Sequence, residues 1–291
     1  MNKTHLLVID PQVDFCMPAN PTLATKLRVA NGGVSSPEID LIGNGGSLYV
    51  TGADQDMVRL AAMIDRLGRK ISNIHVTLDS HQEAHIAHAM FWVDSKGNHP
   101  KPYTMISEDD VKNGVWIPYS LKDRPRAMEY VSKLKTNGRY ALIIWPTHCV
   151  ISTYGAAVFP VFGKSLSNWC KTYFKTIDFC PKGSNPYTEN YSAVMADVID
   201  DNDPTTMLNT TLINVLQTAD TLLLAGEALG FCMANTVTDI ANNFGDENIK
   251  KFVLLTDCTS NVTGYEKLGN DFIDAMTKRG MQLATSADFL A

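Results

Sequence analysis

The segment LLLAGEALGFCMANT at residues 222–236 decides the fold that we expect. It begins with a short, continuous apolar run, which is typical of a parallel strand covered on both faces. Gly226 and Gly230 permit the backbone angles of a tight turn, and a helix is expected over residues 233–243. Cys232 then lies near the start of that helix, where the helix dipole favours a thiolate. A buried core cysteine is the alternative interpretation.

Strand-like and helix-like segments alternate along the rest of the chain. Buried strands are expected at residues 6–9, 71–78, 140–144, 176–179, 222–225 and 251–256. Helices are expected at residues 54–67, 124–137, 153–173, 210–217, 233–243 and 265–279, with a short one near 192–199. This alternation predicts an α/β fold, a Rossmann-like three-layer sandwich with helices on both faces of a six-stranded, mainly parallel sheet. We treat residues 1–291 as a single domain.

Composition excludes several classes of partner. The formal net charge is −6 and the pI is about 5.6, and no cluster of Lys or Arg interrupts this balance, so we expect no nucleic-acid partner. No apolar run is long enough to cross a membrane. The first apolar stretch ends at Asp10 and is too short for a secretion signal. The six cysteines form no Cys-x-x-Cys pair, so we expect a cytoplasmic protein with free thiols.

Reactive side chains follow several of the expected strands. In a parallel sheet the carboxyl ends of the strands meet at one edge, where ligands bind. Asp10, Lys182 and Cys232 lie at such ends and suit acyl transfer, with the thiol as nucleophile and the carboxylate as proton acceptor. The lysine would hold the charge of the site and lower the pKa of the thiol. Taken singly, Asp10 is more readily interpreted as a strand-end cap, and Lys182 as a solvated loop residue, because polar loop residues are common.

A second group of residues suits a metal ion. Asp79 and His81 stand on the same side of an extended segment, and His148 follows the strand expected at 140–144. Two imidazoles and a carboxylate bind Zn²⁺ or Fe²⁺ and leave positions open for water or substrate. His85 and His88 are available to join or support this set. The alternative is that these histidines are merely surface residues.

Six motifs occur together along the chain: VIDPQVDF (8–15), DSHQEAHIAH (79–88), WPTHCV (145–150), PKG (181–183), YTENYS (187–192) and GEALGFC (226–232). In this set and order the chain resembles the isochorismatase-like cysteine hydrolases, and within them the nicotinamidases, also called pyrazinamidases. The resemblance covers most of the chain. It implies a six-stranded Rossmann-like fold and a catalytic triad that matches Asp10, Lys182 and Cys232.

The resemblance also implies a metal cofactor. In nicotinamidases one divalent ion is held by residues that match Asp79, His81 and His148, and this ion meets the pyridine nitrogen of the substrate. We expect Zn²⁺, with Fe²⁺ and Mn²⁺ as alternatives. Some members of the family have an extra metal ligand. His85 matches this extra ligand less well than it matches a histidine that supports the ligands without binding the ion. Isochorismatase-type members lack this metal set, so its presence favours a nicotinamidase.

Further residues match the substrate pocket of the family. Phe15 and Trp145 match aromatic residues that sandwich the substrate ring, and Tyr191 matches another pocket residue. The backbone N–H groups of Ala228 and Cys232 match the oxyanion hole.

The implied reaction converts nicotinamide to nicotinate and ammonia through a cysteine thioester, as a step of NAD salvage. The expected partner is therefore a small-molecule amide, and homo-oligomer formation is left open. One rival is a related amidohydrolase acting on a carbamoyl or ureido compound, against which the metal set argues. The other is a catalytically silent ligand-binding member, against which the intact triad argues.

Three features depart from the family pattern. Two insertions, near residues 17–45 and 89–122, are long for the family. Glu227 stands where family members usually carry an apolar residue, just before the cis peptide bond that the family implies between Glu227 and Ala228. Its carboxylate either accepts hydrogen bonds from nearby loop groups and fixes the turn, which we favour, or points into the pocket and selects another substrate.

Overall fold

The centre of the molecule is a six-stranded sheet. A computed structural model describes residues 3–290 of the chain. All neighbouring strands of the sheet are parallel, in the order β10-β9-β8-β1-β2-β7. The strands are β1 (Thr4–Ile9), β2 (Ile71–Asp79), β7 (Asp178–Lys182), β8 (Thr221–Gly226), β9 (Phe252–Leu255) and β10 (Gln282–Ala284). The central strands β1 and β8 are almost wholly buried, as their continuous apolar runs predict.

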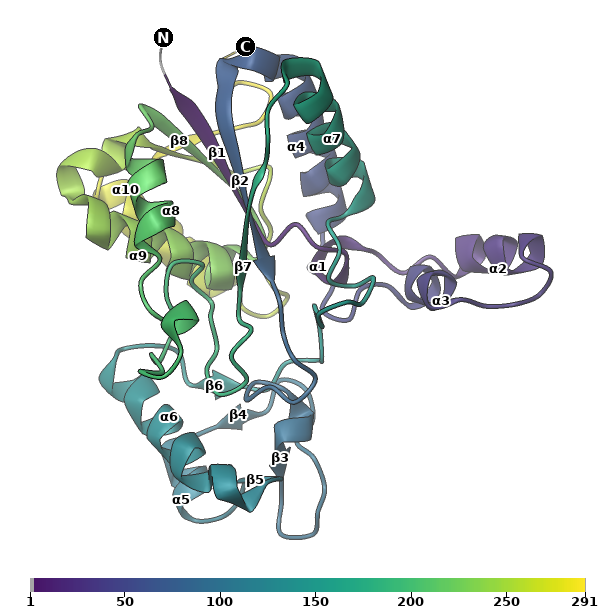
Figure 1. Ribbon diagram of the computed structural model, residues 1–291, viewed down its shortest axis with the longest axis vertical. Coiled ribbons are helices and arrows are strands. Elements are labelled where there is room, and N and C mark those ends of the chain that lie inside the picture. Colours follow the sequence, from purple (N-terminus) through teal and green to yellow (C-terminus); the bar gives the residue numbers. More distant parts are fainter. Residues whose placement is uncertain (1–2, 291) are drawn as a thin grey trace.

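Helices cover both faces of this sheet and complete the three-layer α/β fold predicted from the sequence (Figure 1). One face carries α4 (Ala53–Leu67) and α7 (Pro160–Tyr173), which pack on each other. The other carries α8 (Thr210–Gln217), α9 (Ala234–Phe244) and α10 (Glu266–Lys278). The buried face of α4 includes Met57, Leu60 and Ile64. Val58 and Ala62 of the same helix are exposed.

One of the six expected strands is not part of the main sheet. Residues 140–144 contain β6 (Leu142–Ile143), which pairs antiparallel with β4 (Met105–Ile106) outside the sheet. The sixth place is taken by β10, which pairs with β9 and which we had not expected as a strand. An apolar run shows that a segment is buried but not which strand it pairs with, and β10 is short and largely exposed.

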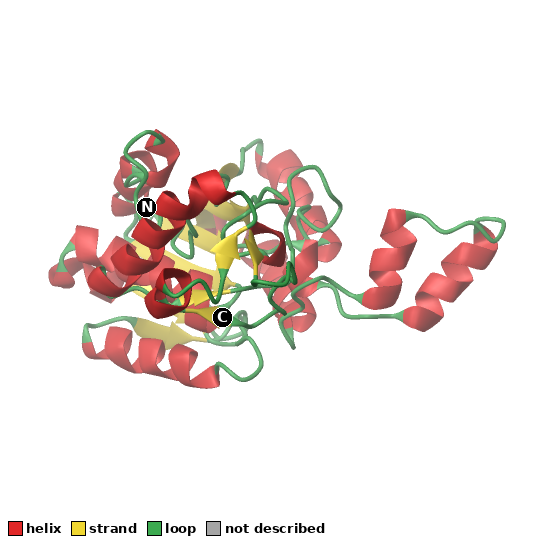
Figure 2. Ribbon diagram, turned by 90° about the horizontal axis from the view of Figure 1, so that it is seen from below, coloured by secondary structure: helices red, strands yellow, loops and turns green. Residues whose placement is uncertain are grey.

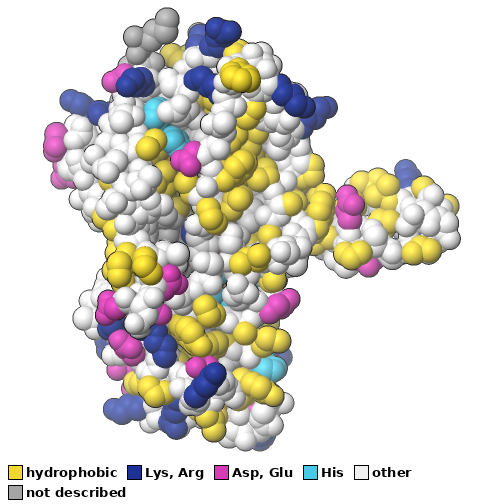
Figure 3. Space-filling view, in the orientation of Figure 1, with side chains coloured by type: hydrophobic (Ala, Val, Ile, Leu, Met, Phe, Trp, Pro, Cys, Tyr) yellow, Lys and Arg dark blue, Asp and Glu magenta, His cyan; other side chains and the backbone are white. Residues whose placement is uncertain are grey.

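The insertion near residues 17–45 is a helical arm rather than an irregular loop. Helices α2 (Pro21–Ala30) and α3 (Pro37–Asn44) pack on each other and project from the body of the molecule (Figures 1 and 2). Each helix has a polar N-cap, Asn20 or Ser36, followed by proline, and this is the local signal for a helix start. Hydrophobic side chains are exposed along the arm (Figure 3).

The insertion near residues 89–122 builds most of a second lobe, here called the lower lobe and comprising residues 89–143 (Figure 1). A short antiparallel pair joins β3 (Trp92–Val93) and β5 (Ile117–Pro118), and α6 (Arg124–Thr136) packs on β5 and on α5 (Glu108–Lys112). The lobe contains η2 (Ala89–Phe91), β3 (Trp92–Val93), β4, α5 (Glu108–Lys112), β5 (Ile117–Pro118), η3 (Leu121–Asp123), α6 (Arg124–Thr136) and β6.

Residues 192–199 form no helix, contrary to expectation. Their backbone N–H groups donate to distant partners instead. Ala193 N–H bonds the Thr236 hydroxyl at 3.0 Å, and Asp197 N–H bonds the Glu189 carbonyl at 2.9 Å. The expected helix at 153–173 begins only at Pro160. The remaining short elements are α1 (Val13–Cys16), η1 (Gly68–Lys70), η4 (Pro204–Thr206), the π-helical turn η5 (Leu229–Met233) and η6 (Asp246–Lys251). Within residues 3–290, no helix combines the length and the hydropathy that a membrane span requires.

Candidate active site

Four adjacent strands deliver reactive side chains to one edge of the sheet. Asp10, Asp79 and Lys182 stand at or just beyond the carboxyl ends of β1, β2 and β7, which are neighbours. Cys232 follows β8 in η5. His148 reaches the same edge differently from our expectation. Its loop runs beside the segment after β2, through a bridge between His81 and Val150, and does not follow a strand of the main sheet.

The Lys182 ammonium group connects the three expected catalytic residues. Its Nζ lies 3.0 Å from Asp10 Oδ2 and donates to Cys232 Sγ at 3.5 Å. It also donates to Asp79 Oδ1 at 3.0 Å and to the Asn190 carbonyl at 2.8 Å. All of these side chains are buried, so the contacts form in a site that is largely shielded from water.

Burial has the largest effect on the pKa of the Cys232 thiol. It raises the pKa of the Cys232 thiol well above its usual value, and the Lys182 ammonium opposes this without reversing it. The lowering of this pKa that we expected from Lys182 is thus outweighed by burial, and a base such as Asp10 is needed to take the proton. Burial also raises the pKa of Asp10, again against the effect of Lys182, which makes this carboxylate a stronger proton acceptor. Burial alone would lower the pKa of Lys182, but Asp10 and Asp79 outweigh it and raise that pKa, which keeps the ammonium charged.

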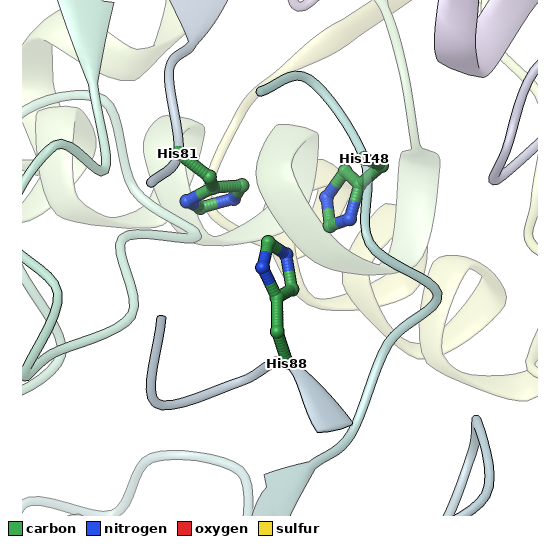
Figure 4. A group of neighbouring side chains, drawn as sticks. All are labelled: His81, His88 and His148. Atoms are coloured by element: carbon green, nitrogen blue, oxygen red, sulfur yellow. The ribbon is translucent and has the colours of Figure 1, made fainter. Parts of the chain in front are cut away.

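Three imidazoles meet beside this group. His81, His88 and His148 come from two loops and converge on one point, with candidate ligand atoms within 4.8 Å of one another (Figure 4). Each Nδ1 faces a backbone carbonyl, that of Gly183 for His81, Glu83 for His88 and Pro146 for His148. Since a carbonyl only accepts, each Nδ1 carries a proton. In a neutral ring Nε2 then offers a lone pair, as metal-ligating histidines do.

This arrangement fits a divalent ion. Asp79 Oδ2 lies 3.0 Å from His81 Nε2 and 3.4 Å from His148 Nε2. His88 Nε2 is buried and has no hydrogen-bond partner among residues 3–290. Burial and the neighbouring His148 lower the pKa of His88 to about 3, so this ring is neutral. Imidazole nitrogens and a carboxylate oxygen are donors that suit Zn²⁺, Fe²⁺ and related ions. His88, only a secondary candidate in the sequence, is therefore as well placed as His148.

Two further residues border the imidazole group. His85 uses both ring nitrogens for backbone contacts, with the Thr188 carbonyl at 3.1 Å and Ala87 N–H at 3.2 Å, as a supporting residue would. Glu189 Oε1 lies 3.9 Å from His81 Nε2, and the Glu189 side chain is buried. Sequence reasoning missed Glu189, because a glutamate in a polar loop carries no local sign of burial.

The expected pocket residues line one narrow cavity. Phe15, Trp145, Tyr191, Ala228 and Cys232 all face it, and its volume is about 30 Å³. That is room for about two water molecules, so an aromatic ligand enters only when lining side chains shift. Trp145 Nε1–H donates to the Tyr191 hydroxyl at 2.9 Å.

Phe231 also lines this cavity and was missed by sequence reasoning. Its ring centroid lies 5.0 Å from that of Trp145 and 5.4 Å from that of Tyr191, so it belongs to the same aromatic cluster. Its position directly before Cys232 is the only signal that the sequence offers.

Glu227 is buried and points away from the cavity. The peptide bond between Glu227 and Ala228 is cis, as expected. Glu227 Oε2 accepts a hydrogen bond from Ser260 N–H at 3.0 Å, whereas Oε1 has no partner. The Ser260 carbonyl in turn accepts from Leu229 N–H at 2.8 Å. The first of the two expected arrangements is therefore present, with the carboxyl group holding the loop that borders η5.

Comparison with solved structures finds proteins that share this fold. No protein-family model matches this chain, and no curated protein does. The yeast nicotinamidase structure aligns at 20% identity with a TM-score of 0.60, covering 97% of this chain and 99% of the other. An isochorismatase family protein from Desulfovibrio vulgaris aligns at 14% identity with a TM-score of 0.51, covering 99% and 97%. The chain has the isochorismatase-like fold. A zinc complex of the Pyrococcus horikoshii pyrazinamidase shares this fold at 18% identity, with a TM-score of 0.52 and coverage of 97% and 99%.

Proposed function

We propose that this protein is a metal-assisted cysteine amidohydrolase that converts nicotinamide to nicotinate and ammonia, a reaction of NAD salvage. The observation that carries the proposal is the buried Lys182 ammonium within 3.0 Å of Asp10 and 3.5 Å of Cys232, beside a cluster of imidazoles. Buried charges are costly unless they are paired, and Lys182 is paired here with Asp10 and Asp79. Paired, buried charges of this kind are frequent at functional sites. The shared fold with a nicotinamidase supports the choice of substrate.

The chemistry begins with proton transfer from the Cys232 thiol to Asp10. The thiolate attacks the amide carbon, and the oxyanion that forms accepts hydrogen bonds from the N–H groups of Ala228 and Cys232, each worth about 3 kcal/mol. Asp10 returns the proton to the leaving nitrogen and the C–N bond breaks. Ammonia then leaves, and the acyl group stays on the Cys232 sulfur as a thioester. Asp10 then takes a proton from water as the water oxygen attacks the thioester carbon. The C–S bond breaks, Asp10 returns the proton to the Cys232 sulfur, and nicotinic acid leaves and ionises to nicotinate. Lys182 remains charged throughout and balances the charge on Asp10.

The metal would be held by Asp79, His81 and His148, with His88 as a further ligand and His85 as a supporting residue. We propose a single divalent ion, Zn²⁺ in preference to Fe²⁺ or Mn²⁺. When bound, it supplies a Lewis acid that orients a ring nitrogen of the substrate.

The ring of the substrate lies between Phe15 and Trp145 in this proposal. Tyr191 closes the pocket and holds the Trp145 indole through the hydrogen bond between them.

The test is ammonia release from nicotinamide by the purified, metal-loaded protein. We expect turnover by the wild type, none by Cys232→Ala, and normal turnover by Cys170→Ser, which changes a partly exposed cysteine in α7. Substantial activity in Cys232→Ala would refute the mechanism. Release of ammonia only from carbamoyl or ureido compounds would replace nicotinamide by that substrate class, and no turnover of any amide would favour a ligand-binding protein.

A further inference from the structure

A second, larger cavity lies between the lower lobe and the loops that border the candidate metal group. Its volume is about 640 Å³, which is in the range of small-molecule sites. It is lined by Gln82, Ala84 and Pro186 from those loops and by residues of the lower lobe. None of its lining residues belongs to the cavity that contains Cys232. The proposed amide hydrolysis therefore leaves this cavity without a role.

Four rings form the walls of this cavity: Phe91, His99, Tyr119 and Tyr187. The Phe91 and Tyr187 centroids are 6.2 Å apart with the rings edge to face, and the His99 and Tyr119 centroids are also 6.2 Å apart. An aromatic face carries negative electrostatic potential, so a space bounded by several rings attracts positive charge.

Backbone contacts hold these walls in place. Tyr119 N–H donates to the Phe91 carbonyl at 2.7 Å and continues the pairing of β3 with β5. His99 Nδ1 donates to the Trp92 carbonyl at 2.7 Å, which fixes the imidazole ring. Ile86 N–H donates to the Pro186 carbonyl at 2.8 Å and joins the two loops of the opposite wall. The cavity is thus preformed, and a ligand would not have to order it.

The lining carries the carboxylate of Asp123 and the imidazole of His99. Asp123 contributes a carboxylate, whose Oδ1 lies 3.5 Å from the Tyr187 hydroxyl. Within residues 3–290, no lysine or arginine lines the cavity. A carboxylate among aromatic rings disfavours an anion and favours a cation. Cages of aromatic rings recognise quaternary ammonium groups through cation–π contacts, and the Asp123 carboxylate adds an attractive charge.

We propose that this cavity binds a small organic cation of the quaternary ammonium class, held by the faces of Tyr119, Tyr187 and Phe91 and by the charge of Asp123. The proposal does not depend on the reaction at Cys232, because the two cavities are separate.

The probe is choline, and its control is 3,3-dimethylbutan-1-ol, the uncharged carbon analogue of the same shape. Saturation-transfer NMR titrations at constant ionic strength follow the methyl protons of each compound over the full-length protein. We expect saturable binding of choline and at least severalfold weaker binding of the alcohol, because only the charge differs.

Two variants test the assigned residues. Tyr119→Leu removes a ring that is 72% exposed, and Asp123→Asn removes only the charge, so both should fold normally. Each should weaken choline binding by about two- to fivefold. The matched controls are Leu121→Ala, an exposed neighbour outside the cavity, and Asp109→Asn, an exposed carboxylate on α5, and neither should change the affinity.

Three results would overturn the proposal. Equal affinity for choline and the alcohol would show an apolar pocket that does not recognise charge. Equal effects of the cavity variants and their controls would place choline elsewhere. The absence of saturable choline binding by the folded wild type would leave the cavity without this class of ligand.

Discussion

Replacing Glu227 by glutamine should stabilise the protein, and the gain should grow as the pH rises. Glu227 is fully buried, and burial together with Asp56 raises its carboxyl pKa well above 4.5. The other groups facing it are Arg59, from the same helix as Asp56, and Cys16 from α1. Arg59 lowers the pKa of Glu227 but is paired with Asp56 at 2.5 Å, so it offsets only part of the effect.

The sign follows from the protons bound in each state. The folded protein keeps the Glu227 proton at pH values where the unfolded chain has released it. Stability of the wild type therefore falls from about pH 4.5 upward until the pH reaches the pKa of the folded state. The slope from this one group approaches 1.4 kcal/mol per pH unit, by the order of magnitude that linkage gives. Glutamine does not titrate, so Glu227→Gln lacks this loss.

Urea unfolding of both proteins at several pH values between about 5 and 8 measures the difference directly. We expect the stability of Glu227→Gln to rise relative to the wild type across this range. Glutamine still offers an oxygen to Ser260 N–H, and its amide group can donate to the Asp56 carboxylate. Parallel stability curves for the two proteins would refute the reasoning, because they would mean that Glu227 titrates at its ordinary pKa in the folded protein.

The Glu227→Val variant tests the hydrogen bond that Glu227 accepts from Ser260 N–H. Relative to Glu227→Gln, which equally lacks a titrating group, valine leaves Ser260 N–H without its acceptor, and this costs about 1–3 kcal/mol whatever the pH. Because Ser260 also bonds Leu229 N–H, kcat should fall together with stability. The ranking of amide substrates should stay the same, since Glu227 does not line the cavity of Cys232. A stable valine variant with a changed ranking would contradict this.

Three further changes probe other parts of the molecule. Asp14→Ala should lower the free energy of unfolding by about 3 kcal/mol or more. The reason is that this buried carboxylate accepts hydrogen bonds from Cys149 N–H at 2.7 Å and from a second backbone N–H. A loss below about 1 kcal/mol in urea unfolding would contradict this prediction. Excision of residues 20–42, with a short turn joining Ala19 to Gly43, should leave Tm nearly unchanged, because α2 and α3 pack mainly on each other. A large fall in Tm, measured in a thermal melt by circular dichroism, would contradict this and show that the arm stabilises the core. His88→Ala should weaken Zn²⁺ binding at least tenfold in calorimetry, by the scale seen for ligand-shell changes; affinity equal to wild type would exclude His88 as a ligand.

Local signals in the chain were enough for much of the fold. The helix expected at 210–217 is observed at those bounds as α8, where the Asn209 side chain caps the first turn and Leu212, Ile213 and Leu216 are buried. Strands β1 and β8 were predicted because buried parallel strands are continuous apolar runs. The irregular segment at 192–199 was mistaken for a helix, because its sequence is compatible with one and the competing partners lie far away in the chain.

The sequence by itself determined which residues stand at the ends of the strands, namely Asp10, Asp79, Lys182 and Cys232. Short-range patterns are sufficient for this, because they show where an apolar run stops and which side chain follows.

Only the tertiary structure decided how these residues are used. The strand order brings Lys182 to both Asp10 and Cys232. Burial raises the pKa of the Cys232 thiol, and the folding of separate loops brings His88 and Glu189 beside His81. Desolvation and the pairing of charges depend on every element packed around a group, and no local pattern in the chain records them.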